Sequence, residues 1–293
     1  MEQQALQRME IPGRVSAKIG QGGLPKLEIA TDWSTGEVYI QGAHITAFQK
    51  RGEQPLLFLS GSSRFEKGQA IRGGVPIIFP WFGPKEGKAA HGFARTGDWV
   101  LHETTATPDG GVSLRFHLAV AAPDWPAHSL VFVATFTDRL RMDLITTNLS
   151  NAPMTFENCL HTYLHVGDIA NVSVRGLKGL EYLDKTESGA RKREPENSLK
   201  PSSETDRVFV NTGETIEVQD TRLNRTILVE KSGSASTVVW NPWIAKAKAM
   251  PDFGDEEYKR MVCVESGNVA DNQLTLKPGK SQILTAVLSS LPF

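Results

Sequence analysis

The sequence predicts an all-β protein built as a large antiparallel β-sandwich. Apolar and polar side chains alternate through 112–118, which is the period of a strand with one buried face. Further short β-rich segments follow toward the C-terminus, separated by turn residues at short intervals. Helical periodicity is scarce along the whole chain, so a sandwich fits better than a mixed fold.

The longest predicted hairpin covers 130–149. Its first strand is the run LVFVATFT, the polar pair Asp138-Arg139 makes the turn, and RMDLITTNL is the second strand. After Pro153 another strand is predicted through MTFENCLHTYLHV. Shorter strands are then expected at 172–174, 207–210, 215–218, 226–230, 237–240, 260–265, 274–276 and 281–288.

The remaining segments complete the predicted organisation. One helical turn is expected at the start of the chain and another at 254–258. The polar, charged and proline-containing stretch 184–203 is expected to be a long exposed loop. Because strands of the same kind continue on both sides of it, residues 1–293 are predicted to form a single domain.

Composition excludes several classes of partner. The chain has 293 residues, of which 32 are basic and 33 acidic, giving a formal net charge of −1. This balance argues against nucleic acid and anionic membrane surfaces as partners. Neither a signal-peptide core nor a membrane-spanning apolar run is found, and the two cysteines make no disulfide framework. A soluble, cytoplasmic protein is expected, and a monomer, because no apolar stripe is left over.

The segment 70–99 contains the most unusual residues. It holds Arg72 before a Gly73–Gly74 pair, three prolines, and His91 and Arg95 near its end. Proline fixes φ and glycine allows close backbone approach, so a rigid irregular loop is predicted that presents two arginines and a histidine. Such a loop could carry function, or it could be a packed crossover whose arginines pair with nearby carboxylates.

Cofactor motifs are missing. The segment GPKEGK at 83–88 is one residue short of a phosphate loop, and Ala89 stands where Ser or Thr is needed. His161 and His165 would lie roughly 13 Å apart on a strand, which is too far for one metal ion. Cys159 could share a face with His161, but a third and a fourth ligand are not evident. Neither a cofactor nor a metal is therefore predicted.

His161 and Glu265 are the candidate acid–base pair. Each lies on a predicted strand, His161 on the same face as Cys159 and Tyr163, and Glu265 on the same face as Cys263. If the two faces line one concave surface, an imidazole and a carboxylate could approach a ligand from two sides. A buried histidine and a glutamate bonded to their neighbours are the commoner outcome for such residues taken alone.

Two other positions leave alternatives open. Asp206 precedes a strand and could simply bond to its own backbone in a turn. Trp240 and Trp243 surround a strand end, where indole faces could pack on a sugar ring, although core packing is commoner for tryptophan.

These segments together resemble the glucose-6-phosphate 1-epimerase (hexose-6-phosphate mutarotase) branch of the aldose 1-epimerase family. Seven pieces carry the resemblance in family order over most of the chain. They are QGAHITAFQ, FLSGSSRFEKGQAIRGGVPIIFPWFGP, AHGFAR, HTYLHVGDI, TDRVF, VVWNPW and MPDFGDEEYKRMVCVES. The resemblance implies a large antiparallel β-sandwich of the galactose mutarotase type, in agreement with the strand pattern.

The resemblance also implies roles for individual residues. His161 matches the general acid of the family and Glu265 its general base. Arg72 and Arg95 match arginines thought to hold the sugar phosphate, and the substrate-contacting positions matched are His91 and Asp206. Some members have Gln where this chain has Ala90, so a contact from that side chain is absent here.

The implied activity is interconversion of the α and β anomers of a hexose 6-phosphate without a cofactor, with glucose 6-phosphate as the expected substrate. Two alternatives are an aldose 1-epimerase acting on unphosphorylated sugars and a noncatalytic carbohydrate-binding β-sandwich. The sequence does not decide the preferred hexose phosphate or the role of the 184–203 segment.

Overall fold

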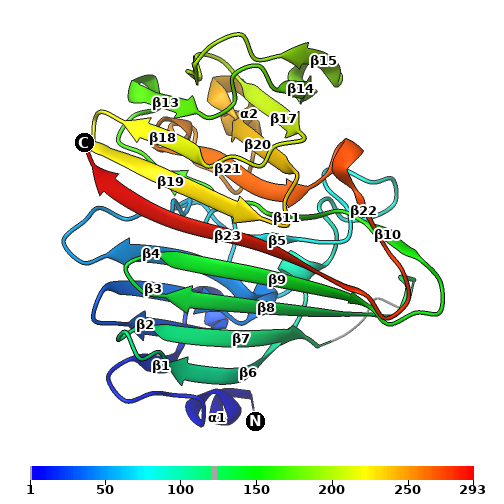
Figure 1. Cartoon of the computed structure of the whole chain (residues 1–293). Coiled ribbons are helices and arrows are strands. Elements are labelled where there is room, and N and C mark those ends of the chain that lie inside the picture. The colour runs from blue at the N-terminus through cyan, green and yellow to red at the C-terminus, as the bar shows by residue number, and fades with distance from the viewer. Residues whose placement is uncertain (1, 120–123) are drawn as a thin grey trace.

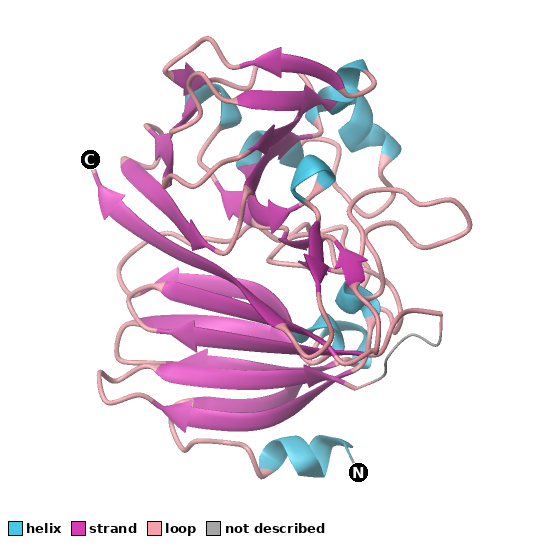
Figure 2. Ribbon diagram, turned by 45° about the vertical axis from the view of Figure 1, so that its right-hand side comes forward, coloured by secondary structure: helices cyan, strands magenta, loops and turns pink. Residues whose placement is uncertain are grey.

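The structure is a computed structural model that describes residues 2–119 and 124–293. Its regular structure is almost entirely β-strand, and every strand pairing within its sheets is antiparallel, which confirms the predicted fold class. Two large sheets and two small ones make up the described part of the chain (Figures 1 and 2).

The nine-stranded sheet contains the longest strands. In spatial order it consists of β16 (Ser198–Leu199), β13 (Val172–Arg175), β18 (Ile216–Asp220), β19 (Arg225–Ser232), β23 (Ser281–Pro292), β9 (Leu140–Asn148), β8 (His128–Phe136), β7 (Val112–Leu118) and β6 (Trp99–Ala106). β8 and β9 form the predicted hairpin, with Phe136 opposite Leu140 at its turn. Seven strands of this sheet were predicted close to their observed positions, whereas β6 and β16 were not predicted.

The eight-stranded sheet carries the candidate site. Its order is β15 (Ala190–Arg193), β14 (Glu181–Asp184), β17 (Thr205–Val210), β20 (Ser236–Asn241), β21 (Met261–Asn268), β11 (Asn158–Leu160) and β5 (Ile77–Ile78), and β12 (Tyr163–His165) also pairs with β21. All residues of β20 and β21 are buried, because neighbouring structure covers both faces of these central strands. A separate pair joins β10 (Met154–Phe156) to β22 (Leu274–Leu276).

A four-stranded sheet at the N-terminus lies against the lower half of the nine-stranded sheet (Figure 1). It consists of β1 (Val15–Ile19), β2 (Pro25–Ala30), β3 (Ser34–Tyr39) and β4 (His44–Lys50), none of which was predicted. Phe136 of β8 packs on Phe48 of β4, with ring centroids 6.1 Å apart. A Cβ on Gly36 would come within 2.4 Å of the Phe136 ring, so the close approach of the two sheets requires glycine there.

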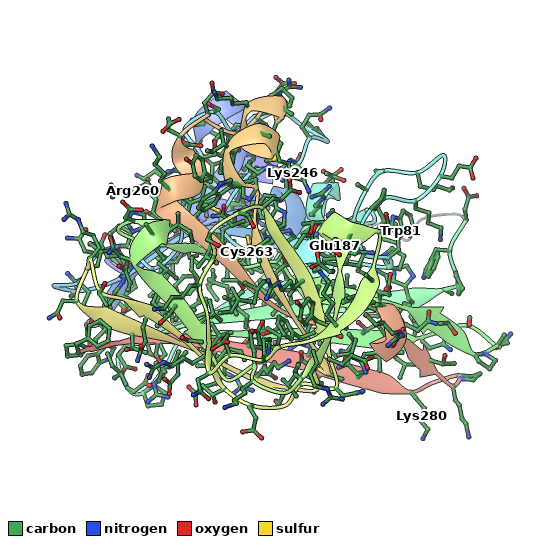
Figure 3. All side chains as sticks on the ribbon, turned by 90° about the horizontal axis from the view of Figure 1, so that it is seen from above. Trp81, Glu187, Lys246, Arg260, Cys263 and Lys280 are labelled. Carbon is green, nitrogen blue, oxygen red and sulfur yellow. The ribbon has the colours of Figure 1, made fainter. Side chains whose placement is uncertain are left out.

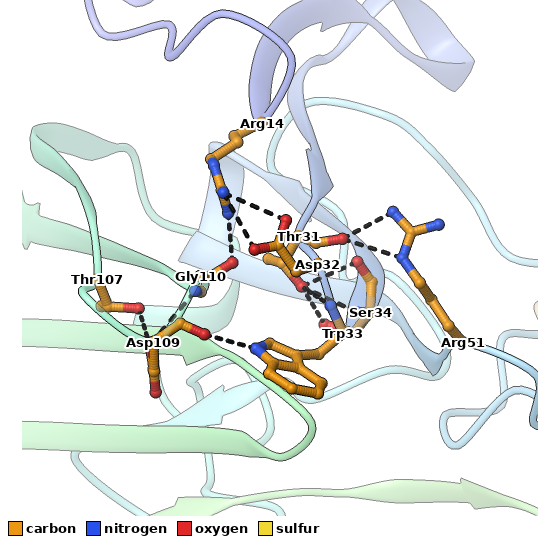
Figure 4. A network of polar contacts seen from close by, with 10 residues as sticks. Arg14, Thr31, Asp32, Trp33, Ser34, Arg51, Thr107, Asp109 and Gly110 are labelled. Carbon is orange, nitrogen blue, oxygen red and sulfur yellow. Dashed lines mark hydrogen bonds and ion pairs between the residues drawn. The ribbon is translucent and has the colours of Figure 1, made fainter.

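Polar contacts connect this small sheet to the β6–β7 turn (Figure 4). Arg14 donates to the carbonyl of Gly110 and forms an ion pair with Asp32 at 3.2 Å. The indole of Trp33 donates to the carbonyl of Asp109 at 2.6 Å. These contacts connect the turn between β2 and β3 to the turn between β6 and β7.

Helices are short. α1 (Glu2–Gln7) confirms the predicted turn at the start of the chain, and α2 (Trp243–Ala249) was not predicted. Single 3₁₀ turns are η1 (Gln21–Gly23), η2 (Gln41–Ala43), η3 (Ala94–Thr96), η4 (Ile169–Asn171), η5 (Lys185–Glu187), η6 (Glu257–Arg260) and η7 (Ala270–Asn272). The turn expected at 254–258 is thus found slightly later, as η6. Within the described residues, none of the helices has the length and apolar character needed to cross a membrane.

Two predictions about local structure are wrong. The single strand expected at 154–166 is broken into β10, β11 and β12, because Thr162 turns back to donate to the carbonyl of Leu160. The stretch 184–203 is not one exposed loop. It contains η5, β15 and β16, and Glu194 within it is buried and accepts a hydrogen bond from Arg207 at 2.6 Å. The irregular loop predicted at 70–99 is confirmed apart from β5, η3 and the first residue of β6.

Candidate active site

An open cavity of about 280 Å³ lies over the eight-stranded sheet, between the irregular loop and α2. Its lining combines acids, bases and aromatic rings contributed by segments distant in sequence. The lining residues are Arg72, Phe82, Gly83, Pro84, His91, His161, Tyr163, Lys185, Asp206, Val238, Trp240, Lys246, Met250 and Glu265. Five of the six residues predicted from the sequence therefore line one cavity, and the sixth, Arg95, lies close behind it.

His161 and Glu265 meet at the floor of this cavity. His161 lies in the break between β11 and β12, where its backbone N–H donates to the carbonyl of Pro76 at 3.0 Å. Glu265 lies in β21, opposite Val238 of β20. The Nε2 atom of His161 is 3.4 Å from Oε1 of Glu265, and the two side chains are only 9% and 1% exposed. The expectation that both face one concave surface is met.

Aromatic rings fix the imidazole of His161. Tyr163 stacks on it with a centroid distance of 4.8 Å and an interplanar angle of 10°. Trp240 meets the same imidazole edge-on at 6.2 Å. Trp243 instead begins α2 and packs on Tyr258, and it does not line the cavity. Of the two tryptophans, Trp240 is therefore the one placed beside the acid–base pair.

Burial shifts the pKa values of the pair in opposite directions. Burial, His91 and the nearby guanidinium groups hold the pKa of His161 well below its usual value. Burial and the carboxylate of Asp206 hold the pKa of Glu265 well above its usual value. The 3.4 Å contact would favour an ion pair, whereas burial disfavours the charged form of both groups.

Arg72 is held by two partners on one wall of the cavity. Its guanidinium forms an ion pair with Asp252 at 3.0 Å and donates from Nη1 to the phenol oxygen of Tyr163 at 3.1 Å. Tyr163 and Asp252 together raise the pKa of Arg72, so this group stays charged. The sequence indicated only that the arginines of the loop could pair with carboxylates. It did not identify Asp252, which is far from Arg72 in the chain.

Arg95 approaches the same wall from behind. It donates to the carbonyl of Ala90 at 2.8 Å, while its Nε is buried without a partner among the described residues. Burial and the charge of Arg72 contribute to lowering the pKa of Arg95 to about 10. His91 lies nearby at a positive φ of 65°, and burial lowers its pKa to about 3, so its imidazole is neutral. Two like charges and an unpaired buried donor make this wall receptive to an anion.

Another part of the cavity lining combines the predicted Asp206 with two lysines that were not predicted. Asp206 of β17 lies there, and burial raises the pKa of its carboxyl group. Lys246 of α2 is 2.8 Å from Glu204 and 3.8 Å from Asp206, and Lys185 of η5 also lines the cavity. Both lysines belong to segments whose structure was predicted wrongly or not at all. The signal available in the sequence was only their positive charge.

The fold and the cavity define a class of protein: a β-sandwich with a buried imidazole–carboxylate pair in a cavity that is also lined by basic side chains. Comparison with known proteins identifies the family. Residues 25–288 match the aldose 1-epimerase family. The chain therefore belongs to the aldose 1-epimerase family.

Two relatives and one structural neighbour illustrate the match. A Cenchrus ciliaris protein named "putative glucose-6-phosphate 1-epimerase" is 36% identical over 273 residues, which cover 87% of this chain and 81% of that protein. The crystal structure of a "putative mutarotase" from Salmonella typhimurium is 30% identical, covers 97% and 96% of the two chains and superposes with a TM-score of 0.90. A galactose mutarotase-like protein from Clostridium acetobutylicum shares the fold at 15% identity and a TM-score of 0.73, covering 95% and 98%. The predicted fold type is confirmed.

Proposed function

We propose that this protein is an enzyme that interconverts the α and β anomers of a hexose 6-phosphate, with glucose 6-phosphate as its substrate. The observation that carries the proposal is the buried contact between His161 and Glu265 within a cavity that is open to a small molecule. The names of its relatives agree with this activity. Opening a sugar ring by general acid–base catalysis needs one group that accepts a proton and a second group that donates a proton.

The proposed reaction opens and recloses the sugar ring. Ionised Glu265 takes the proton of the anomeric hydroxyl, and protonated His161 gives a proton to the ring oxygen. This step leaves a free aldehyde, a neutral imidazole and a protonated carboxyl group. After rotation about the C1–C2 bond, His161 recovers the proton from the ring hydroxyl, and Glu265 returns its proton to the aldehyde oxygen. While the sugar is in its open-chain form, both His161 and Glu265 are neutral, which is the state that burial favours.

Substitution of the pair tests this mechanism. His161→Ala and Glu265→Ala should each lower the rate of catalysed anomer exchange by about 10²–10⁴-fold, the range typical of general acid–base assistance. Two-dimensional exchange NMR on glucose 6-phosphate measures the rate, and circular dichroism checks folding. His165→Gln is the matched control, since this half-buried histidine lies nearby in β12 but outside the cavity lining. Activity retained in either alanine variant would refute the mechanism.

The basic groups around the cavity support a phosphorylated substrate. Arg72, Lys185 and Lys246 line it, and the buried Nε of Arg95 has no partner in the part of the chain that the structure describes. We propose that Arg72 and Arg95 bind the phosphate, whose oxygens suit forked guanidinium donors. His91 and Asp206 are proposed to contact the sugar hydroxyls.

Comparing phosphorylated and free sugar tests the phosphate assignment. A hydrogen bond to a charged group contributes about 1.5–3 kcal/mol, so Arg72→Met should lower kcat/KM for glucose 6-phosphate by about ten- to a hundredfold. The value for glucose should change much less. Lys67→Met is the control, because Lys67 is exposed and lies outside the cavity lining. Equal losses on both sugars would favour an epimerase of unphosphorylated aldoses, and a ligand-induced melting shift without faster exchange would favour a binding protein.

We further propose that the protein acts as a cytoplasmic, single-domain monomer whose partners are small molecules. Its two cysteines are buried and unpaired, as suits a reducing compartment. One hydrophobic cluster joins residues from Leu6 to Leu288 across the large sheets, as suits one folding unit.

A further inference from the structure

A third potential ligand lies beside the acid–base pair. Cys263 is two residues before Glu265 in β21, so both side chains point to the same face of the strand. It also lies directly opposite Tyr163 of β12, the ring that stacks on His161. A donor atom from each of His161, Cys263 and Glu265 lies within 4.8 Å of the other two.

The three donors form a set that suits a borderline or soft divalent cation. An imidazole nitrogen, a thiolate sulfur and a carboxylate oxygen are the three ligand types of zinc sites in proteins. Two ligands at roughly 2.05 Å from a tetrahedral ion are about 3.3 Å apart. His161 and Glu265 are already separated by 3.4 Å, so only the thiol has to approach. Two of the donors are anionic when bound, which offsets the charge of a buried divalent ion.

The open side of the set faces the cavity. His161 and Glu265 line the cavity, whereas Cys263 (labelled in Figure 3) does not line it and is fully buried. Three protein ligands with a fourth position open to a cavity is the arrangement of zinc sites that exchange their fourth ligand. This set was not predicted from the sequence, because Cys159, and not Cys263, was considered as the cysteine on the same face as His161.

We propose that His161, Cys263 and Glu265 form a binding site for a thiophilic divalent cation such as Zn²⁺, and that its occupation excludes sugar. A bound cation occupies the lone pairs of both acid–base groups, so it blocks any proton transfer through them. It also takes the position above the pair that a sugar ring would fill. Arg72 and Arg95 lie close enough to repel a cation, so binding is weaker than at an all-cysteine structural site.

Cobalt titration tests the site without relying on turnover. Co²⁺ bound through Cys263 should give a thiolate-to-cobalt charge-transfer band that saturates at one equivalent and is displaced by Zn²⁺. Cys263→Ser should abolish this band. Cys159→Ser is the matched control, since Cys159 is a second fully buried thiol that touches Glu265 at 3.5 Å but lies outside the three-donor group. The control should keep the band.

Activity provides the second readout. Zn²⁺ should inhibit anomer exchange competitively with hexose 6-phosphate, and a chelator should reverse the inhibition. Cys263→Ser should raise the inhibitory Zn²⁺ concentration by at least about tenfold, which corresponds to the loss of one ligand contact of about 1.4 kcal/mol. Cys159→Ser should not change it.

Several outcomes would overturn the proposal. They are the absence of a thiolate band in the unmodified protein, a band that survives in Cys263→Ser, or a band lost only in Cys159→Ser. If Cys263→Ser does not fold, X-ray absorption of the zinc-loaded unmodified protein and of Cys159→Ser still decides. Each should contain one sulfur ligand at about 2.3 Å, and a shell without sulfur refutes the site. A protein that binds cobalt but shows no epimerase activity would refute the proposed function and leave the metal site standing.

Discussion

The protonation state of His161 and Glu265 follows from what surrounds them. Each is almost fully buried, and burial disfavours the charged form of both groups. Asp206 adds a negative charge that disfavours ionised Glu265 further. The surroundings therefore favour a neutral imidazole and a protonated carboxyl group, which are the forms that the proposed reaction produces when the sugar ring opens.

This arrangement predicts an unusually wide pH profile for kcat/KM. Activity requires one proton on the pair, so the acid limb reports protonation of His161 and the alkaline limb reports ionisation of Glu265. Because the pKa of His161 is lowered from 6.5, the acid limb should lie below pH 6.5. Because the pKa of Glu265 is raised, the alkaline limb should lie far above the ordinary carboxyl range. Exchange NMR across pH measures both limbs.

Asp206→Asn provides the control for that assignment. Removing the negative charge of Asp206 should lower the pKa of Glu265 and move the alkaline limb to lower pH, whatever happens to the absolute rate. The acid limb should stay nearly in place. The second pKa of a sugar phosphate is about 6, so the titration of the substrate phosphate is measured separately by phosphorus NMR. An alkaline limb that does not move would assign it to a group other than Glu265.

The candidate site residues could be identified from the sequence, whereas the residues that contact them could not. His161, Glu265, Arg72, His91 and Asp206 were singled out and do line one cavity. Their positions depend on pairing between strands that are far apart in the chain, which no local pattern encodes. For the same reason the partner of Arg72, Asp252, was not recognised.

The irregular loop depends on its glycines to present the site residues. Gly92 lies next to His91 and has a φ of +74°. It packs so closely on the backbone just after β5 that an added Cβ would lie 1.9 Å from the carbonyl oxygen of Phe79. Phe93 and Ala94 then donate to the same carbonyl. Only glycine permits both the positive φ and this approach.

A pair of glycine substitutions separates these two effects. Gly92→Ala should lower the free energy of unfolding by more than about 2 kcal/mol, since it adds a backbone clash to the strain of a positive φ. Gly87→Ala is the matched control in the same loop, with a φ of +67° and open space around its Cβ, and should cost only about 1 kcal/mol. Urea unfolding followed by circular dichroism measures both. Equal losses of stability in the two variants would show that backbone strain alone, without a clash, explains why glycine is required at position 92.

Elements with a strong period-2 pattern were predicted and those with interrupted patterns were missed. β7 was predicted with its observed bounds because its buried and partly exposed residues alternate regularly. In β2, Leu27 and Ile29 are buried on either side of exposed Glu28, but the strand begins with a proline directly after a glycine-rich turn. The break at Thr162 was unpredictable, because it is fixed by contacts with Val264 of β21.

On the scale of the whole molecule, the sandwich keeps several histidines neutral in its interior. His44 of β4 is fully buried, and its Nε2 lies 2.8 Å from the carbonyl oxygen of Gly73 in the irregular loop. Burial lowers the pKa of His44 to about 4 and is the main reason that the pKa of His165 is lowered to about 4. These groups are uncharged in the fold at a pH where they are charged in the unfolded chain.

Stability should therefore fall as the pH drops below 6.5. Between pH 6.5 and about 4 the unfolded chain takes up protons that folded His44 does not accept, so acid favours unfolding. A shift of this size corresponds to about 3 kcal/mol lost by pH 4 from His44 alone. The loss is absent above pH 6.5, where both states carry a neutral imidazole. Urea unfolding at a series of pH values measures it, and a single-domain protein should unfold in one transition throughout.

His44→Gln isolates this contribution, because glutamine can donate to the carbonyl of Gly73 but does not titrate. The variant should be less stable than the unmodified protein at pH 7, where the shape of the imidazole is lost without any proton uptake. The difference should then shrink by about 3 kcal/mol as the pH approaches 4, since only the unmodified protein loses stability through residue 44. Curves that stay parallel from pH 7 to 4 would mean that His44 is charged inside the folded sandwich, and a biphasic curve would contradict the single domain.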